Sequence, residues 1–332
     1  MDEIKVSIIM PVYGVEHHIE RSLRSVMRQD YAGPLECIIV DDCTPDKSME
    51  IADRLLHGYN GPIRFRVVRR QKNGGLSAAR NTGIRESAGG HLFFLDSDDE
   101  IMPHAISTLM AMAEKYPGVD LVYGDWYTSH RYNGLQNKPG MAEYIPNHQE
   151  AARRIFSGYL SMTAQNKLFR AQFVRDNSLF FKEGILHEDT HLNYFIAEAV
   201  ESIAVSYVPT YVYYLNPSGI TGKPSERNIQ SMLAIASDVL QNGKNWFRHF
   251  YALVCLNVVI RRSENDENLR TATRLLKELA HSSAQEHLHL LVPLLQIETI
   301  LPLSLKRTRL FQMFHRIAVA LLRRLYVHRR GI

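Results

Sequence analysis

The chain has 332 residues, of which 45% are hydrophobic and 22% are charged, and its formal net charge is +4. These proportions are typical of a globular protein and exclude a disordered or collagen-like chain. The length fits two domains, or one large α/β domain with an extension. The three cysteines lie far apart, which argues against a disulfide scaffold or a cysteine-built zinc site and favours a reducing compartment.

Positive charge is concentrated near the C-terminus. Residues 303–332 contain eight of the 39 Lys and Arg residues and no Asp or Glu, which leaves 31 basic and 35 acidic residues in positions 1–302. The first residues lack the basic region and apolar run of a signal peptide. No apolar stretch approaches the roughly 20 residues that a membrane-spanning helix needs. We therefore expect a cytoplasmic protein without a membrane-spanning helix.

Short apolar runs alternate with segments of helical periodicity along the first 126 residues. The predicted strands lie at residues 6–10, 37–40, 66–69, 91–95 and 119–126, and Pro11 is expected to end the first. The predicted helices lie at 16–29, 44–56 and 76–87, with a fourth beginning near Pro103. Thr44 and Pro45 have the character of an N-cap and a first helical residue. This alternation predicts an α/β fold with a mainly parallel sheet covered by helices on both faces.

The pattern changes in the second half of the chain. The alternation breaks down from about residue 140, and one further strand is predicted around 203–215. Beyond Pro224 the periodicity indicates helices only. We therefore predict a domain over residues 1–224, followed by an α-helical region over 225–332.

Carboxylates follow two of the predicted strands. Asp41 and Asp42 follow the second strand, and the sequence Asp96-Ser-Asp-Asp99 follows the fourth. In an open α/β sheet, ligands bind at the carboxyl ends of the strands, so these groups are expected at one edge. Like charges brought together repel, and a bound cation relieves the repulsion. Asp96 and Asp98 suit Mg²⁺ or Mn²⁺ shared with a diphosphate; the alternative is a solvated acidic turn that caps the next helix.

A glycine-containing segment runs from Asn73 to Gly83. Its paired glycines permit a close approach of backbone to ligand, and Arg80 offers a fork of donors for phosphate or a carbonyl edge. The segment has neither the G-x-G-x-x-G spacing nor the G-x-x-x-x-G-K-[ST] spacing, so it is not a dinucleotide fingerprint or a P-loop. The alternative is a simple turn before a helix with an exposed arginine.

Four segments together carry a resemblance to a known family. They are Val6-Ser-Ile-Ile-Met-Pro-Val-Tyr13, Ile39-Val-Asp-Asp42, Asn73-Gly-Gly-Leu-Ser-Ala-Ala-Arg-Asn81 and Phe94-Leu-Asp-Ser-Asp-Asp99. In order and spacing they resemble family 2 of the glycosyltransferases, which has the GT-A fold. The resemblance is strong over residues 5–125 and continues, more weakly, to about 222. It implies a nucleotide-binding half at about 1–125 and an acceptor half at about 126–224.

The resemblance also implies roles for individual residues. Pro11, Tyr13 and Asp42 would line the nucleobase pocket, and Asp96 would lie near the ribose. Asp98, together with Asp96, would hold the metal, and Asp189 of the pair Glu188-Asp189 would be the catalytic base. The remaining nucleotide-binding residues implied are Asn73, Arg80 and Ser97.

The implied reaction is an inverting transfer of a hexosyl or N-acetylhexosaminyl group from a UDP-sugar to a hydroxyl of a glycan or lipid-linked glycan acceptor. Such a transfer needs a carboxylate that takes the acceptor proton, and a Mn²⁺ or Mg²⁺ ion that neutralises charge on the departing diphosphate. By analogy the setting is the synthesis of cell-surface polysaccharide or lipopolysaccharide. A non-catalytic sugar-nucleotide-binding protein is an alternative, which the presence of both Asp98 and Asp189 disfavours.

One motif competes with this interpretation. His187-Glu-Asp-Thr-His191 matches H-E-x-x-H, in which two imidazoles on one helical face bind zinc in a hydrolase. Both variable positions are polar here, and Gly184 lies just upstream. We therefore expect His187 to precede the helix, which would leave His191 alone on it.

The basic C-terminal tail at 303–332 also has two interpretations. Apolar residues recur at helical spacing from Arg309 to Arg330, and arginines occupy many of the other positions. This pattern is typical of a helix that lies in the interface of an anionic membrane, here the cytoplasmic face of the inner membrane. The alternative is a helix whose apolar stripe packs on the body or on a second subunit. No nucleic-acid-binding module accompanies the charge, so no nucleic-acid partner is expected.

Overall fold

The computed structural model describes residues 4–128, 142–156, 160–215, 225–244 and 247–285. The basic tail at 303–332 therefore lies outside the described residues, as do the helix predicted at 309–330 and its membrane interpretation. The chain divides into two compact units. Unit 1 comprises Met1–Gly184 and Ala199–Pro217, and unit 2 comprises Ile185–Glu198 and Ser218–Ile332.

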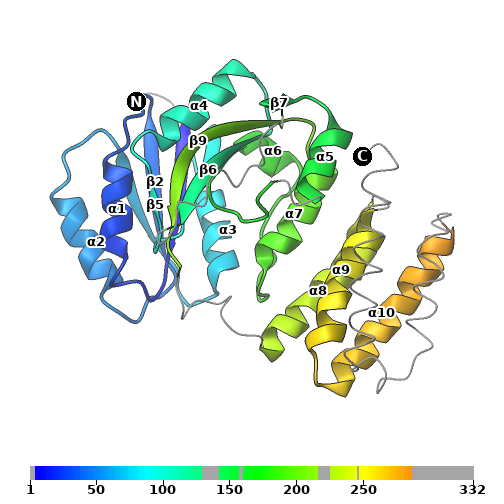
Figure 1. Cartoon of the computed structure of the whole chain (residues 1–332). Helices are drawn as coiled ribbons and strands as arrows, with labels where there is room; N and C mark the ends of the chain where they lie inside the picture. The colour runs from blue at the N-terminus through cyan, green and yellow to red at the C-terminus, as the bar shows by residue number, and fades with distance from the viewer. Residues whose placement is uncertain (1–3, 129–141, 157–159, 216–224, 245–246, 286–332) are drawn as a thin grey trace. The chain divides into compact units, whose positions relative to one another are not determined.

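Unit 1 is built around a sheet that has nine strands in the part of the chain described (Figure 1). The strands are β1 (Val6–Val12), β2 (Leu35–Asp41), β3 (Arg64–Arg69), β4 (His91–Phe94), β5 (Glu100–Ile101), β6 (Leu121–Thr128), β7 (Tyr144–Ile145), β8 (Lys167–Arg170) and β9 (Ile203–Tyr213). Their order is β3-β2-β1-β4-β8-β6-β9-β5, and β7 also pairs with β9. The helices are α1 (Ile19–Met27), α2 (Ser48–His57), α3 (Leu76–Glu86), α4 (Ala105–Lys115), α5 (His148–Phe156) and α6 (Ala171–Asp176).

The first four strands in this order are parallel, and the rest of the sheet is mixed. Strands β3, β2, β1 and β4 pair in parallel, β8 runs antiparallel to both β4 and β6, and β6 is parallel to β9. Strand β1 extends through Pro11 to Val12, although the sequence predicted its end at Pro11. The last residue of β1 that pairs with β4 is Ile9, so Pro11 needs no N–H group on that side.

Helices cover both faces of the sheet, which confirms the fold class predicted from the sequence (Figure 1). Alternate residues of β1 and β2 pack against α1, α2 and α4 in one core that includes Ile8, Ile39 and Leu109. On the other face, Ile38 and Val40 pack against Ala79 of α3. Gly83 lets α3 approach closely, because a Cβ there would lie 2.3 Å from Cγ2 of Ile9.

The start of the second helix differs from the prediction. Helix α2 begins at Ser48, and Thr44 is not its N-cap. The Thr44 side chain instead accepts a hydrogen bond from the N–H group of Gly14 at 2.8 Å and donates one to Asp46 at 2.7 Å. Asp46 in turn accepts a hydrogen bond from the N–H group of Ser48 at 3.1 Å. The capping signal at Thr44 therefore serves a loop that ties the ends of β1 and β2 together.

The helices described in unit 2 are α7 (Glu188–Ala199, whose last residue falls in unit 1), α8 (Glu226–Asn242), α9 (Phe247–Arg262) and α10 (Asp266–Gln285). Polar contacts join α7 to its neighbours. The Tyr251 hydroxyl donates to the carbonyl of Thr190 at 2.5 Å, and Nε2 of His191 lies 2.5 Å from Oδ2 of Asp238. Among the helices described, none is long and apolar enough to cross a membrane.

Candidate active site

The candidate site begins at the carboxyl ends of β1, β2 and β4. Strand β1 lies between β2 and β4, so the order of strands reverses there. This reversal is the position at which open α/β sheets bind ligands. Tyr13 follows β1, Asp42 follows β2 and Asp96 lies two residues after β4, so the sheet brings all three to one edge. Pro11 is buried, whereas Tyr13 is 52% exposed.

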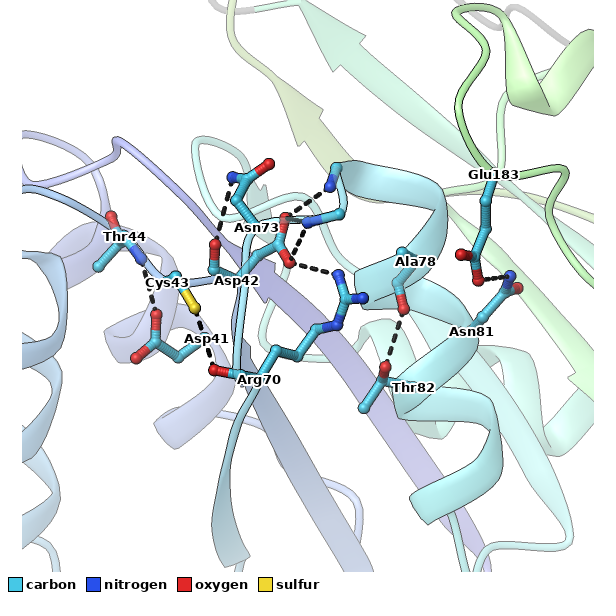
Figure 2. A network of polar contacts seen from close by, with 12 residues as sticks. Asp41, Asp42, Cys43, Thr44, Arg70, Asn73, Ala78, Asn81, Thr82 and Glu183 are labelled. Carbon is cyan, nitrogen blue, oxygen red and sulfur yellow. Dashed lines mark hydrogen bonds and ion pairs between the residues drawn. The ribbon is translucent and has the colours of Figure 1, made fainter.

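Asp42 is the centre of a tight polar network (Figure 2). Its buried carboxylate accepts hydrogen bonds from the N–H groups of Gly74 and Gly75, at 2.8 Å for Gly75, and forms an ion pair with Arg70. The carbonyl of Asp42 accepts a hydrogen bond from the Asn73 side chain at 3.2 Å. Asp42 therefore fixes the segment 73–75 that precedes α3, where Gly75 has a left-handed φ of 83°.

Arg70 is a residue of this network that the sequence did not single out. It follows Arg69 at the end of the edge strand β3, and basic residues after such a strand usually indicate solvated charge. Here only 18% of its side chain is exposed, and it contacts Asp42 from 28 positions further along the chain. Figure 2 shows its guanidinium directed at the Asp42 carboxylate.

Replacing Asp42 with Asn is expected to lower the free energy of unfolding by about 2–3 kcal/mol, because the charge-assisted hydrogen bonds are lost and Arg70 keeps an uncompensated charge. Asp41 offers a matched control. It is the adjacent carboxylate, it accepts a hydrogen bond from the N–H group of Thr44 at 2.9 Å, and Asn preserves that acceptor. Denaturant unfolding should show a loss below about 1 kcal/mol for Asp41→Asn. If both variants lost the same free energy of unfolding, the stabilising role of the Asp42 network would be wrong.

The turn after β4 carries three carboxylates in different environments. Oδ1 of Asp96 pairs with Nη2 of Arg80 at 2.7 Å, and only 2% of the Arg80 side chain is exposed. Ser97 is buried, and Asp98 is partly exposed. The Asp99 side chain is buried, and accepts hydrogen bonds from the Tyr211 hydroxyl and the Tyr214 N–H group, both at 2.8 Å. Arg80 therefore reaches this turn through Asp96.

The electrostatics of the turn are unfavourable without a counter-charge. Burial, and then the charge of Asp96, raise the pKa of Asp99 to about 8, and Asp98 adds to the effect. Burial and the same three carboxylates also raise the pKa of Tyr213. The negative charge of this turn therefore also affects the ionisation of Tyr213, on the neighbouring strand β9.

In metal-free protein, Asp99 is expected to make the stability depend on pH. Below its ordinary pKa of about 4 the carboxyl is neutral in both states; between that value and about 8 the unfolded chain ionises while the folded chain keeps the proton. Stability should therefore fall as pH rises through this window, by an upper bound of about 5 kcal/mol. Asp99→Asn should lack this component, which unfolding in EDTA at pH 5 and pH 8 measures. If the free energy of unfolding changes with pH as much in the variant as in the wild type, this prediction is wrong.

The turn fits a divalent cation by the chemistry of its donors. Asp96 and Asp98 provide carboxylate oxygens, which Mg²⁺ and Mn²⁺ prefer, at a position with excess negative charge. Within the described residues, no group of three or more His, Cys, Asp or Glu side chains could hold a metal ion. A cation here would take one or two carboxylates from the protein and its other ligands from phosphate oxygens or water.

Glu188 and Asp189 lie at the start of α7, in unit 2. Glu188 is only 8% exposed, whereas Asp189 is partly exposed. The Asp189 carbonyl accepts a hydrogen bond from the side chain of Asn193, four residues further along α7, at 2.8 Å. Asp189 is therefore the more accessible carboxylate of the pair.

The two histidines of the H-E-x-x-H motif do not share a helical face. Helix α7 begins at Glu188, and His187 has a left-handed φ of 61°, so it precedes the helix as expected from the sequence. His191 is buried on α7, where Nε2 contacts Asp238 and the ring packs on Phe195 with centroids 5.0 Å apart. The paired arrangement of a zinc hydrolase is therefore not formed.

Residues 7–177, just over half of the chain, match the family model described as Glycosyl transferase family 2. The chain therefore belongs to glycosyl transferase family 2, as the resemblance in its sequence implied, and it has the GT-A fold. A Bacillus subtilis protein described as the uncharacterized glycosyltransferase EpsJ is 33% identical over 231 residues. That alignment covers 66% of this chain and 63% of the relative, so this chain matches less than two thirds of EpsJ.

Solved structures of glycosyltransferases share the fold. The crystal structure of TarS 1–349 from S. aureus, in complex with UDP-GlcNAc, aligns with a TM-score of 0.70, and the alignment covers 90% of this chain and 88% of that one at 18% identity. The mannosyltransferase PcManGT from Pyrobaculum calidifontis, in complex with GDP-Man and Mn²⁺, aligns with a TM-score of 0.53, over 97% and 88% of the two chains, at 16% identity. UDP-GlcNAc is the ligand in the TarS structure, and GDP-Man and Mn²⁺ are the ligands in the PcManGT structure.

Proposed function

We propose that this glycosyltransferase transfers a hexosyl or N-acetylhexosaminyl group, with inversion, from a UDP-sugar to a hydroxyl of a glycan or lipid-linked acceptor. The observation that supports the proposal is that two features lie at the point where the strand order reverses. One is the network of Asp42, Arg70 and the segment 73–75, and the other is the carboxylate turn from Asp96 to Asp99. They lie at the edge where a nucleotide diphosphate would bind in this fold.

The proposal assigns these residues to the donor. Pro11, Tyr13 and Asp42 contact the nucleobase, and the Asp42 network sets the position of that pocket. Asp96 lies by the ribose and shares the metal with Asp98, while Asn73, Arg80 and Ser97 complete the nucleotide site. A bound divalent cation supplies positive charge that stabilises the departing diphosphate.

Asp189 acts as the general base in this proposal. It takes the proton of the acceptor hydroxyl as the oxygen attacks the anomeric carbon on the face opposite the diphosphate. One carboxylate suffices for a single displacement, and the transition state resembles an oxocarbenium ion. The greater exposure of Asp189 supports its choice over Glu188, which lies beside it as a buried acidic neighbour.

The acceptor and the cellular setting are also part of the proposal. A lipid-linked glycan acceptor would place the protein in the synthesis of cell-surface polysaccharide, peripherally bound at the membrane through residues 303–332. The B. subtilis relative and S. aureus TarS are both bacterial glycosyltransferases, which supports a bacterial setting.

A donor panel tests the proposal. UDP-sugars and GDP-sugars are incubated with the full-length protein, Mn²⁺ and a membrane lipid extract, and release of the nucleoside diphosphate is measured. The expected result is release from at least one UDP-hexose or UDP-N-acetylhexosamine. Release from GDP-sugars alone would contradict the UDP assignment.

A further inference from the structure

Helix α1 presents a row of polar side chains to the segment 96–106 that carries the carboxylate turn. Ser22 lies 3.5 Å from the carbonyl of Asp96, and Ser25 accepts a hydrogen bond from the N–H group of Ile101 at 3.2 Å. Gln29, two residues beyond the end of α1, donates to the carbonyl of Met102 at 2.8 Å. Arg21, Ser22 and Ser25 have the spacing of one helical face. Helix α1 is therefore a rigid support for the turn.

Arg21 makes the most extensive contacts of this row. Its Nη2 donates to the main-chain carbonyl of Asp98 at 2.5 Å, and its Nε lies 3.2 Å from Oε1 of Glu100. Its guanidinium lies over the Tyr214 ring, with Cζ 3.6 Å from the ring centroid. A planar guanidinium can make these three contacts at once, whereas the ammonium group of lysine cannot.

Tyr214 links this cluster to the end of β9. Its hydroxyl donates to Oε1 of Glu100 at 2.7 Å, and its N–H group donates to Oδ1 of Asp99 at 2.8 Å. Tyr214 directly follows β9, which ends at Tyr213. Arg21 therefore joins the main chain at Asp98 to two separate parts of unit 1, α1 and the end of β9.

We propose that Arg21 is a positioning residue, which fixes the main chain at Asp98 and thereby sets the affinity of the site for a divalent cation bound with a nucleoside diphosphate. This inference rests on the proposed function, in which Asp98 holds the metal. Its physical basis is that a carboxylate ligand must be oriented before the metal binds, and that loss of the groups that orient ligands typically costs about 10–100-fold in metal affinity.

Arg21→Lys tests the proposal, because it keeps the positive charge and removes the fork and the stacking. Calorimetric titration of Mn²⁺ into the full-length protein with excess UDP should give an affinity about tenfold weaker than that of the wild type. Arg24→Lys is the matched control. Arg24 lies on the same helix in an exposed pair with Glu20 at 2.8 Å, and its replacement should leave the affinity unchanged. Thermal unfolding of each variant checks that the fold is retained.

Two further variants separate the outcomes. Tyr214→Leu removes the ring that Arg21 contacts, and it should also weaken Mn²⁺ affinity. Combining Arg21→Lys with Tyr214→Leu should cause no further loss of affinity, because the two residues act as one unit. Arg21→Gln removes the charge. Tighter Mn²⁺ binding by Arg21→Gln, with Arg21→Lys equal to the wild type, would show an effect of charge alone and overturn the proposal.

Asp98→Asn distinguishes failure of this inference from failure of the proposed function. If Asp98→Asn loses Mn²⁺ affinity and Arg21→Lys does not, the positioning role is wrong and the metal assignment stands. If Asp98→Asn binds Mn²⁺ as the wild type does, the metal assignment itself is wrong.

Discussion

Replacing Asp98 with Asn is expected to lower the rate of sugar transfer at least about 100-fold at saturating donor and Mn²⁺, which corresponds to about 2.7 kcal/mol of transition-state stabilisation. The reason is that Asp98 and Asp96 are the two carboxylates of the turn proposed to hold the cation, and the cation counters charge that grows on the departing diphosphate. Without Asp98 the cation keeps a single carboxylate ligand at the turn, Asp96, whose Oδ1 is also paired with Arg80 at 2.7 Å. Initial rates of nucleotide release, with the donor identified by the panel, measure the effect.

Asp41→Asn is the control for this variant. Asp41 is another carboxylate at the end of a parallel strand, and 14% of its side chain is exposed. It belongs to β2 rather than to the turn after β4. Its replacement should change the rate no more than about twofold, since the rate effect requires a ligand of the cation. An Asp98→Asn variant that turns over as fast as Asp41→Asn would remove Asp98 from the mechanism.

Replacing Asp189 with Asn is expected to lower kcat by about 10²–10⁴-fold while leaving donor affinity nearly unchanged. The amide keeps the size of the side chain but cannot take the proton of the acceptor hydroxyl. The partial exposure of Asp189 is consistent with a group that must reach an acceptor. Single-turnover transfer gives the rate of the chemical step, and titration with UDP and Mn²⁺ gives the donor-site affinity.

Two variants of unit 2 serve as references for Asp189. Glu278 is an exposed acid on α10, and Glu278→Gln should leave kcat unchanged. Glu188→Gln reports on the buried neighbour. If Asp189→Asn retains turnover and Glu188→Gln abolishes it, the base is Glu188 and the assignment within the pair is reversed.

Strands β1 to β4, β6 and β9, the first and third helices and the edge of the sheet at which the carboxylates gather could be predicted from the sequence, whereas the short strands β5, β7 and β8 were not predicted. Apolar runs such as Val6–Met10 and Cys37–Val40 bury both faces of a strand, so local composition suffices to identify them. The positions of Asp42 and Asp98 follow from the strands that precede them. The family resemblance added the roles, which chain patterning alone does not supply.

The partners of these carboxylates could not be predicted, because they come from distant parts of the chain. Arg70 reaches Asp42 across 28 positions, and Arg21 reaches Asp98 across 77. In the sequence each is an ordinary basic residue, just after an edge strand for Arg70 and on an amphipathic helix for Arg21. The start of α2 was predicted wrongly for the same reason, since Thr44 bonds to Gly14, 30 positions away, rather than to its own helix.

The most direct test of the account is a titration of UDP into the full-length protein with Mn²⁺ and, separately, with EDTA. We predict binding in Mn²⁺ that is tighter by at least about tenfold than in EDTA, and that loses this difference in Asp98→Asn. Binding of UDP with equal affinity in Mn²⁺ and EDTA, or no binding in either, would contradict the proposal that the carboxylate turn after β4 is the metal-dependent nucleotide site.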